Sequence, residues 1–120
     1  MAADVEALKK RTKDFAVRVF KLCRALPKDR EADVIARQIL RSASSVAANH
    51  RAVCRARSRA DFIAKLGVVI EEVDETLFWL EFLADCGVMP TKKLIELVKE
   101  ANELTAIFVS ARETSRSRKW

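Results

Sequence analysis

The sequence is poor in the residues that form turns between β-strands. It contains two glycines, two prolines and no tyrosine, and no stretch alternates apolar and polar residues for long. Hairpin turns rely on glycine, proline and asparagine, and half-buried strands rely on such alternation. We therefore expect an all-α protein. Half of the 120 residues are apolar, which suffices for one core in a single domain.

Cysteine is also scarce, and long apolar runs are missing. The three cysteines, Cys23, Cys54 and Cys86, are far apart and form no C-x-x-C pair. Isolated thiols of this kind are typical of small core residues in a reducing compartment. The N-terminal segment carries charges where a signal peptide would be apolar, and no run approaches the roughly 20 apolar residues that span a bilayer. We expect a cytoplasmic protein with no membrane partner.

Candidates for catalysis and metal binding are few. His50 is the single histidine, and no cysteine or carboxylate stands at ligand spacing from it. The Glu-x-x-His pairs of di-iron bundles are missing, as is a glycine-rich phosphate loop. No serine or cysteine can be paired with a base except through His50. The sequence therefore predicts no enzyme activity, no metal site and no cofactor.

Apolar residues recur at steps of three and four along four segments, which predicts four amphipathic helices. The first covers about residues 4–26 and ends at Pro27, and the second covers about residues 31–56. The third begins after Ser58, where Ser58 and Asp61 have the pattern of a capping box, and ends at a left-handed cap on Gly87. The fourth begins at residue 90 or 91.

Short links between helices of roughly 20 to 28 residues favour an antiparallel up-down-up-down four-helix bundle. We assign residues 1–111 to this bundle. The segment 112–120, RETSRSRKW, is basic and has no apolar stripe, so we expect a disordered tail there. Its residues Arg116, Arg118, Lys119 and Trp120 would offer backbone contacts and one stacking group to a nucleic acid.

Charge is segregated along the chain. The formal net charge is +6, yet residues 27–60 contain eight Lys or Arg against three Asp or Glu, whereas residues 61–90 contain one against seven. Such segregation either attracts polyanions to one side or pairs subunits through opposite faces.

Most arginines of the second helix share one side. Four of them fall within about 80° of each other on a helical wheel, away from the apolar stripe. A phosphate backbone binds such a strip by Coulomb attraction and counterion release, with little sequence reading. The alternatives are a solvated helix face, or arginines that pair with the acidic third helix of a neighbouring subunit. The residues predicted to bind nucleic acid are Arg37, Arg41, Arg51, Arg55, Arg57 and Arg59, and the orientation of a further cluster, Lys9, Lys10, Arg11 and Lys13, stays open.

The middle of the second helix is rich in small residues. They let another backbone approach closely, and Asn49, at the edge of the apolar stripe, can bond a neighbouring carbonyl. His50 lies in the centre of the stripe and is predicted to be packed and hydrogen-bonded. We interpret Asn49, His50, Ser58 and Asp61 as structural, together with the small residues Ser42, Ala43, Ser44, Ser45, Ala47 and Ala48.

The end of the third helix, TLFWLEFLADCG from Thr76, is apolar almost all round. We assign Leu77, Leu80 and Ala84 to the core. Its aromatic residues would expose roughly 500 Å² if they stayed in water, near the upper limit for a monomer. Self-association would cover them, and so would the fourth helix or the loop before it. The residues predicted to form an oligomer interface are Val68, Phe78, Trp79, Phe82, Leu83 and Cys86.

One combination of motifs resembles a known family. Arg41-Ser42-Ala43 and Ser45-Val46-Ala47-Ala48-Asn49 are followed by Arg57-Ser58 and Asp61-Phe62, then by an apolar and acidic helix end and a glycine. This pattern resembles the small four-helix-bundle proteins found in intervening sequences of bacterial large-subunit ribosomal RNA genes. It also resembles the related accessory variability proteins of diversity-generating retroelements, and it covers about residues 10–110.

The resemblance implies an up-down four-helix bundle, often assembled as a ring of five, with a basic surface. It implies nucleic acid and a reverse transcriptase as partners, because the retroelement members bind both, and it implies no catalytic residues. Many relatives have Glu-Gly after the asparagine, whereas His50-Arg51 follow here, which indicates a divergent branch. We therefore expect a homo-oligomer that binds RNA or DNA, with a protein-assembly module that has no nucleic-acid partner as the alternative.

Overall fold

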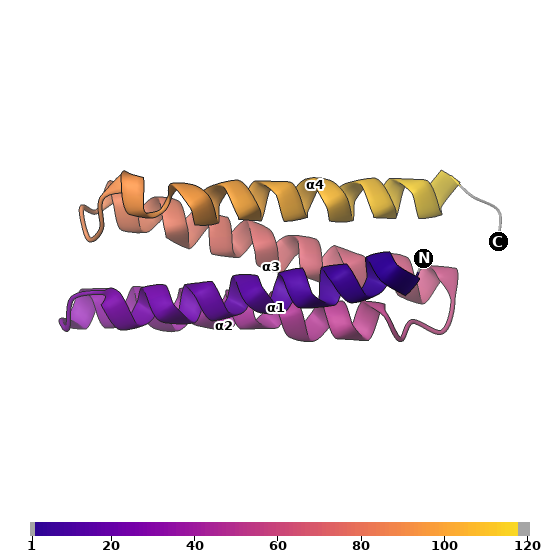
Figure 1. Ribbon diagram of the computed structural model, residues 1–120, viewed down its shortest axis with the longest axis horizontal. Coiled ribbons are helices and arrows are strands. Elements are labelled where there is room, and N and C mark those ends of the chain that lie inside the picture. Colours follow the sequence, from indigo (N-terminus) through magenta and orange to yellow (C-terminus); the bar gives the residue numbers. More distant parts are fainter. Residues whose placement is uncertain (1, 118–120) are drawn as a thin grey trace.

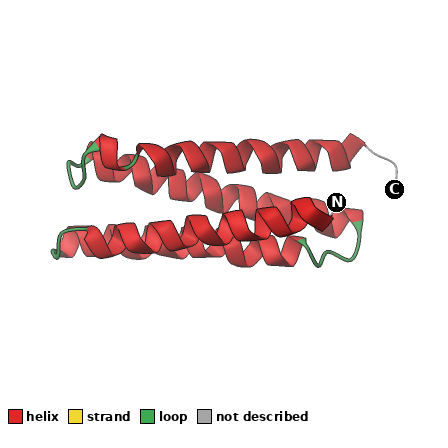
Figure 2. Cartoon of the chain, viewed as in Figure 1, coloured by secondary structure: helices red, strands yellow, loops and turns green. Residues whose placement is uncertain are grey.

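The computed structural model describes residues 2–117 and consists of long helices joined by short links (Figure 1). Across these residues there is no β-strand (Figure 2). None of the described helices is apolar enough over a sufficient length to cross a membrane. The elements are α1 (Ala2–Ala25), α2 (Arg30–Val53), α3 (Arg59–Asp85), the short 3-10 helix η1 (Thr91–Lys93) and α4 (Ile95–Ser117).

The four long helices lie side by side in a rod of 51 × 22 × 19 Å. Each helix packs against the next one along the chain, whereas α1 and α4 touch much less. In Figure 1 the links between successive helices lie at alternating ends of the rod, so these contacts are consistent with the predicted up-down-up-down order. The fold is all-α with four long helices, as the sequence predicted.

Local signals set several helix ends. Asp29 caps α2 by accepting a hydrogen bond from the Ala32 N–H at 2.9 Å, which satisfies one of the unpaired donors of the first turn. Ser58 caps α3, because its hydroxyl accepts the Asp61 N–H at 3.1 Å. Gly87 has a φ of 70°, a left-handed conformation that glycine adopts without a Cβ penalty. The predicted capping box and glycine cap are confirmed.

The end of α2 differs from the prediction. The helix stops at Val53, and the N–H groups of Arg55 and Ala56 bond to the carbonyls of Ala52 and Val53 three residues earlier. Residues 54–56, which the sequence assigned to the end of the helix, form this tightened turn instead. It turns the chain toward Ser58, where α3 begins.

Residues 112–117 correct the predicted tail, because α4 continues to Ser117. Ser115 is 6% exposed and lies seven residues, about two turns, after the buried Phe108. Glu113 and Arg116 form an ion pair at 3.0 Å, three residues apart on the helix. The stripe therefore continues through a small polar residue that a search for apolar side chains overlooks. Arg118, Lys119 and Trp120 lie outside the described residues.

The core also corrects the register of α3. Its buried residues follow steps of three and four: Leu66, Val69, Val73, Thr76, Leu80 and Leu83. Leu77 and Ala84, which the sequence placed at the centre of the stripe, lie half-buried at its flank. Leu83 is fully buried, because it lies three residues after Leu80 on the same side. It belongs to the core and cannot form part of an outer face.

Candidate nucleic-acid interface

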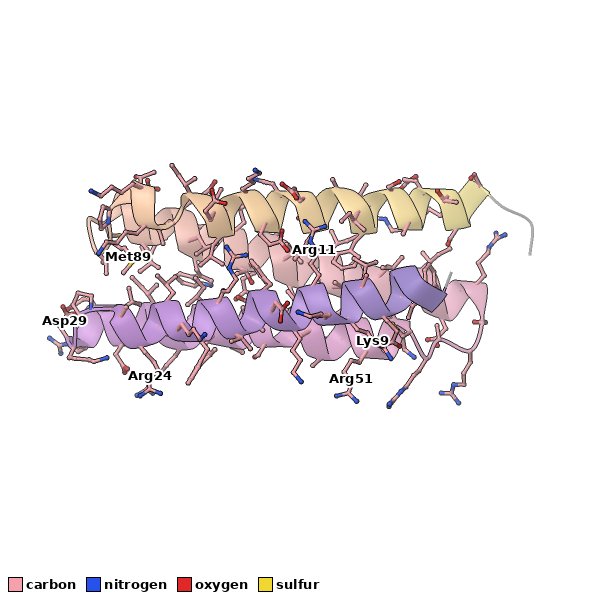
Figure 3. The ribbon with its side chains drawn as sticks, in the orientation of Figure 1. Lys9, Arg11, Arg24, Asp29, Arg51 and Met89 are labelled. Carbon is pink, nitrogen blue, oxygen red and sulfur yellow. The ribbon has the colours of Figure 1, made fainter. Side chains whose placement is uncertain are left out.

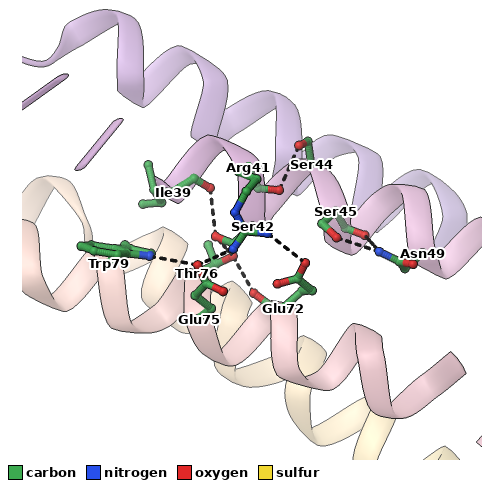
Figure 4. A network of polar contacts seen from close by, with 10 residues as sticks. All are labelled: Ile39, Arg41, Ser42, Ser44, Ser45, Asn49, Glu72, Glu75, Thr76 and Trp79. Atoms are coloured by element: carbon green, nitrogen blue, oxygen red, sulfur yellow. Dashed lines mark hydrogen bonds and ion pairs between the residues drawn. The ribbon is translucent and has the colours of Figure 1, made fainter. Parts of the chain in front are cut away.

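Arg41 does not stand free on an outer strip. Its guanidinium hydrogen-bonds to Glu75 and lies 3.4 Å from a carboxylate oxygen of Glu72, and both glutamates belong to α3 of the same chain (Figure 4). Arg41 holds the pKa of Glu75 below its ordinary value, assisted by the indole N–H of Trp79, which donates to Glu75 Oε2 at 3.2 Å. Arg41 thus joins α2 to α3 within one subunit.

A buried hydroxyl pair lies beside this ion pair. Thr76 Oγ1 is 2.9 Å from Ser42 Oγ and 2.8 Å from the carbonyl oxygen of Glu72 (Figure 4). Ser42 Oγ is also 3.1 Å from the carbonyl oxygen of Ile39. Both hydroxyls are buried and each has a hydrogen-bond partner, so the small Ser42 lets α2 and α3 approach without leaving either hydroxyl unpaired.

The side chains of Asn49 and His50 contact other groups inside the bundle. The Asn49 amide donates to the carbonyl oxygen of Ser45 at 2.9 Å and to Ser45 Oγ at 2.7 Å, within its own helix. His50 is buried with its ring centroid 5.4 Å from that of Phe108, and its Nδ1 lies 3.9 Å from the Cys54 thiol. Burial lowers the His50 pKa, and the nearby charge of Lys9 lowers it further. The imidazole is therefore neutral at neutral pH.

The described residues contain no group of three or more His, Cys, Asp or Glu side chains placed to hold a metal ion. Asp61 serves the start of α3 instead. One of its carboxylate oxygens accepts the Arg57 N–H at 3.1 Å and pairs with the Lys65 ammonium at 2.9 Å. Lys65, followed by this N–H, lowers the Asp61 pKa.

Arg51, near the end of α2, meets cations from α1 along a surface groove of about 660 Å³. Lys9, Lys10 and Lys13 line it from α1, and Arg51 lines it from α2. An adjoining hollow of about 470 Å³ shares Arg51 and is also lined by Arg55, Arg57 and Lys65. Figure 3 shows Lys9 and Arg51 at the same end of the α1–α2 pair. We call the two hollows together the basic groove. Glu6 also lines it, and its cations are Lys9, Lys10, Lys13, Arg51, Arg55, Arg57 and Lys65.

Several cations of the groove are available to a ligand. The side chains of Lys13, Arg51, Arg55 and Arg57 form no ion pair with the side chains described for residues 5–117. Lys9 pairs with Glu6 at 3.4 Å, Lys10 with Asp14 at 2.7 Å and Lys65 with Asp61 at 2.9 Å. Surface pairs of this kind contribute about 0–1 kcal/mol, so a phosphate can replace the carboxylate at small cost.

The structure thus divides the predicted strip. Arg51, Arg55 and Arg57 lie together, Arg41 is held by α3, and Arg37 pairs with Asp33 of its own helix at 3.0 Å. Arg59 is half-buried at the start of α3 and does not line the groove.

The sequence left the orientation of Lys9, Lys10 and Lys13 open and gave no indication of Lys65. The helix 1 cluster splits, because Lys9 and Lys13 face α2 while Arg11 points toward α4 and lies 2.7 Å from both Glu100 and Glu103 (Figure 3). These two carboxylates raise the Arg11 pKa. A helical wheel separates Lys9 and Arg11 by about 200°, so the sequence already indicates that the two side chains lie on opposite sides of the helix.

The predicted oligomer interface is partly exposed. Val68, Phe78 and Phe82 on α3 are 43%, 51% and 36% exposed, and Cys86 is also exposed. The Phe78 and Phe82 rings stack with centroids 5.6 Å apart, and Trp79 packs edge-on against both while it also contacts the core. The outer α3 face therefore consists of Val68, Phe78, Phe82 and Cys86, with Trp79 at its edge and without Leu83.

Comparison with known proteins identifies a family and a similar solved structure. The sequence model of the 23S rRNA-intervening sequence proteins matches residues 5–110. Among solved structures, a protein of unknown function from the S23 ribosomal protein family of Bacteroides thetaiotaomicron VPI-5482 is similar, with 32% sequence identity and a TM-score of 0.84. The similarity covers 91% of this chain and 97% of the other. No curated protein matches the chain.

Proposed function

The chain belongs to the family of 23S rRNA-intervening sequence proteins, and from this premise we propose that it binds RNA or DNA through the basic groove. In this proposal the chain is non-enzymatic and assembles as a homo-oligomer of up-down-up-down bundles. One observation carries the proposal: cations without an ion pair line the same groove from both sides, Lys13 from α1, and Arg51 from α2 with Arg55 from the turn after it.

A phosphate backbone fits this arrangement by charge and by shape. Neutralised phosphates release condensed counterions, which makes the binding favourable and strongly salt-dependent. The floor of the groove is formed by Ala16, Ser44, Ala47 and Ala48, so a backbone can approach the cations without meeting a bulky side chain. Contacts of this kind position a nucleic acid and read little sequence.

Arg51 and Arg55 offer the sharpest test of the groove. We expect the double variant Arg51→Glu, Arg55→Glu to lose most of its affinity for a mixed-sequence RNA, measured by fluorescence anisotropy at low salt. The control Arg30→Glu, Lys28→Glu changes the net charge equally at the far end of the α1–α2 pair, where both side chains are exposed. The control should bind nearly as the natural sequence does. Full affinity in the Arg51, Arg55 variant would remove the groove from the mechanism.

Self-association is proposed through the outer α3 face, and the family resemblance favours a ring of five. Phe78 and Phe82 are the observation in its support, because stacked aromatic rings left half-exposed favour burial against another surface. We expect Phe78→Ser to lower the mass measured by light scattering. Ile95→Ser is the matched control, because Ile95 is 52% exposed on α4 while Phe78 is 51% exposed on α3. A monomeric natural protein would contradict this part of the proposal.

The resemblance to retroelement accessory proteins extends the proposal to a reverse transcriptase as a protein partner. Co-purification with such an enzyme, retained after nuclease treatment, would support a direct contact. The alternative, an assembly module without a nucleic-acid partner, is favoured by the same outer α3 face. An oligomer that takes up no RNA or DNA at low salt would select that alternative.

A further inference from the structure

The cations of the basic groove stand on both of its long sides. Lys9, Lys10 and Lys13 form a row on α1. Arg51, near the end of α2, and Arg55, in the turn that follows it, form a second row, here called the α2 row. Packed helices have axes about 8–10 Å apart. The two rows are thus separate lines of positive charge with a shallow groove between them.

The length of each row sets how many phosphates it can meet. Four residues of α-helix rise about 6 Å, which is the step from Lys9 to Lys13. Arg55 follows Arg51 by the same number of residues, in the turn after α2. One strand of a duplex carries a phosphate every 3.4 Å or so along its axis. Each row therefore spans about two phosphates of one strand, and the two rows together span about four.

Among the described residues, the groove offers no side chain on which an unpaired base could stack. No aromatic side chain within residues 5–117 lines either hollow, and the floor between the rows consists of alanines and Ser44. Proteins that bind single strands combine a basic groove with aromatic stacking platforms, which contribute about 1–3 kcal/mol per base. A duplex keeps its bases stacked on each other, so it needs no aromatic side chain in the groove.

We propose that the basic groove selects duplex over single-stranded nucleic acid, with the phosphates of one strand on the α1 row and those of the other strand on the α2 row. The inference rests on the proposed function and names its ligand class. Duplex grooves are bordered by two phosphate rows, about 6 or 12 Å apart in B-form DNA, which suits two rows of flexible side chains on neighbouring helices. A single strand has one such row and leaves half of the cations unused.

The first arm of the test compares three fluorescein-labelled probes of one mixed sequence, each about 20 nucleotides long so that it exceeds the groove. The probes are an unstructured single-stranded RNA, its RNA duplex and the corresponding DNA duplex. At about 50 mM salt, where phosphate contacts are strong, at least one duplex should bind about tenfold or more tightly than the single strand. The duplex that binds more tightly shows whether RNA or DNA is the preferred ligand.

The second arm removes one row. In Lys9→Gln, Lys10→Gln, Lys13→Gln, duplex affinity should fall about tenfold or more while single-strand affinity changes less than about threefold, because a single strand still has the α2 row. The control Arg18→Gln, Lys21→Gln, Arg24→Gln removes three exposed cations of the same helix that do not line the groove. It should leave the preference for a duplex intact.

The outcomes separate this inference from the proposed function. Equal or tighter binding of the single strand, or an equal loss for both ligands in the Lys variant, would overturn the duplex assignment and leave nucleic-acid binding in place. Failure of all three probes to bind would overturn the proposed function itself. A duplex preference that depends on the three lysines supports the inference.

Discussion

Lys9 and Arg11 are two positions apart on α1 and face opposite neighbours. Lys9 lines the basic groove beside α2, whereas Arg11 pairs with Glu100 and Glu103 on α4. One basic cluster of the sequence thus divides into a ligand-facing residue and a residue that joins two helices. This division leads to the first prediction.

Arg11→Gln should lower the stability of the bundle without weakening nucleic-acid binding. Its two carboxylate partners would lose their cation, and α1 and α4 have few other contacts. We expect a loss of about 1 kcal/mol or less, since the pair is partly solvated, measured by urea unfolding. Lys9→Gln should show the reverse pattern, with weaker binding and nearly unchanged unfolding. Reduced nucleic-acid binding in the single variant Arg11→Gln would contradict the assignment of Arg11 to the α1–α4 contact.

Arg41→Gln should behave as a structural variant as well. Arg41 pairs with Glu72 and Glu75 across the α2–α3 contact, so its removal should lower the melting temperature. Affinity for RNA should change less than in Arg51→Gln, which removes an unpaired arginine of the same helix. A loss of affinity as large as that of Arg51→Gln would return Arg41 to the binding surface.

Leu83→Ala tests the corrected register of α3. Leu83 is fully buried, so the variant leaves a cavity and should lose about 2–5 kcal/mol of unfolding free energy. Val68→Ala, on the exposed side of the same helix, should cost much less. Chemical denaturation below the concentration at which subunits associate provides the comparison. A nearly neutral Leu83→Ala would place Leu83 on the outer face after all.

His50 should make stability depend on pH below neutrality. Burial lowers its folded-state pKa, so below the unfolded-state value of about 6.5 the unfolded chain binds a proton that the native state does not. Stability contributed by the neutral imidazole is complete above that value and is lost as pH falls toward the folded-state pKa. The melting temperature should therefore drop as the pH falls below about 6.5, which is still above the ordinary carboxylate range. His50→Leu should flatten this dependence, and an equally steep profile in that variant would refute the role of His50.

Local signals made several features predictable. The Ser58–Asp61 cap and the Gly87 turn involve residues within one turn of each other, so sequence spacing determines them. The stripe of α2 was also predictable, and it includes the buried His50. In each case the physical requirement lies inside one helix.

Features that depend on a second helix were harder to predict. The side of α2 on which Arg41 lies was evident, but its pairing with Glu75 depends on the rotation of α3. Leu83 was placed on the outer face because the whole end of α3 is apolar, and apolar pattern alone does not show which side the neighbouring helices cover. The basic groove likewise exists only once α1 lies beside α2.

Binding through the basic groove is best measured by the salt dependence of nucleic-acid affinity, compared between the natural protein and the double variant Arg51→Gln, Arg55→Gln. If about four phosphates are neutralised, the logarithm of the association constant should fall with the logarithm of salt concentration with a slope of about −3.6 for a duplex. Loss of the two arginines should reduce the magnitude of that slope by about 2. The same slope in both proteins would contradict the account, because the phosphates would then be bound somewhere other than the basic groove.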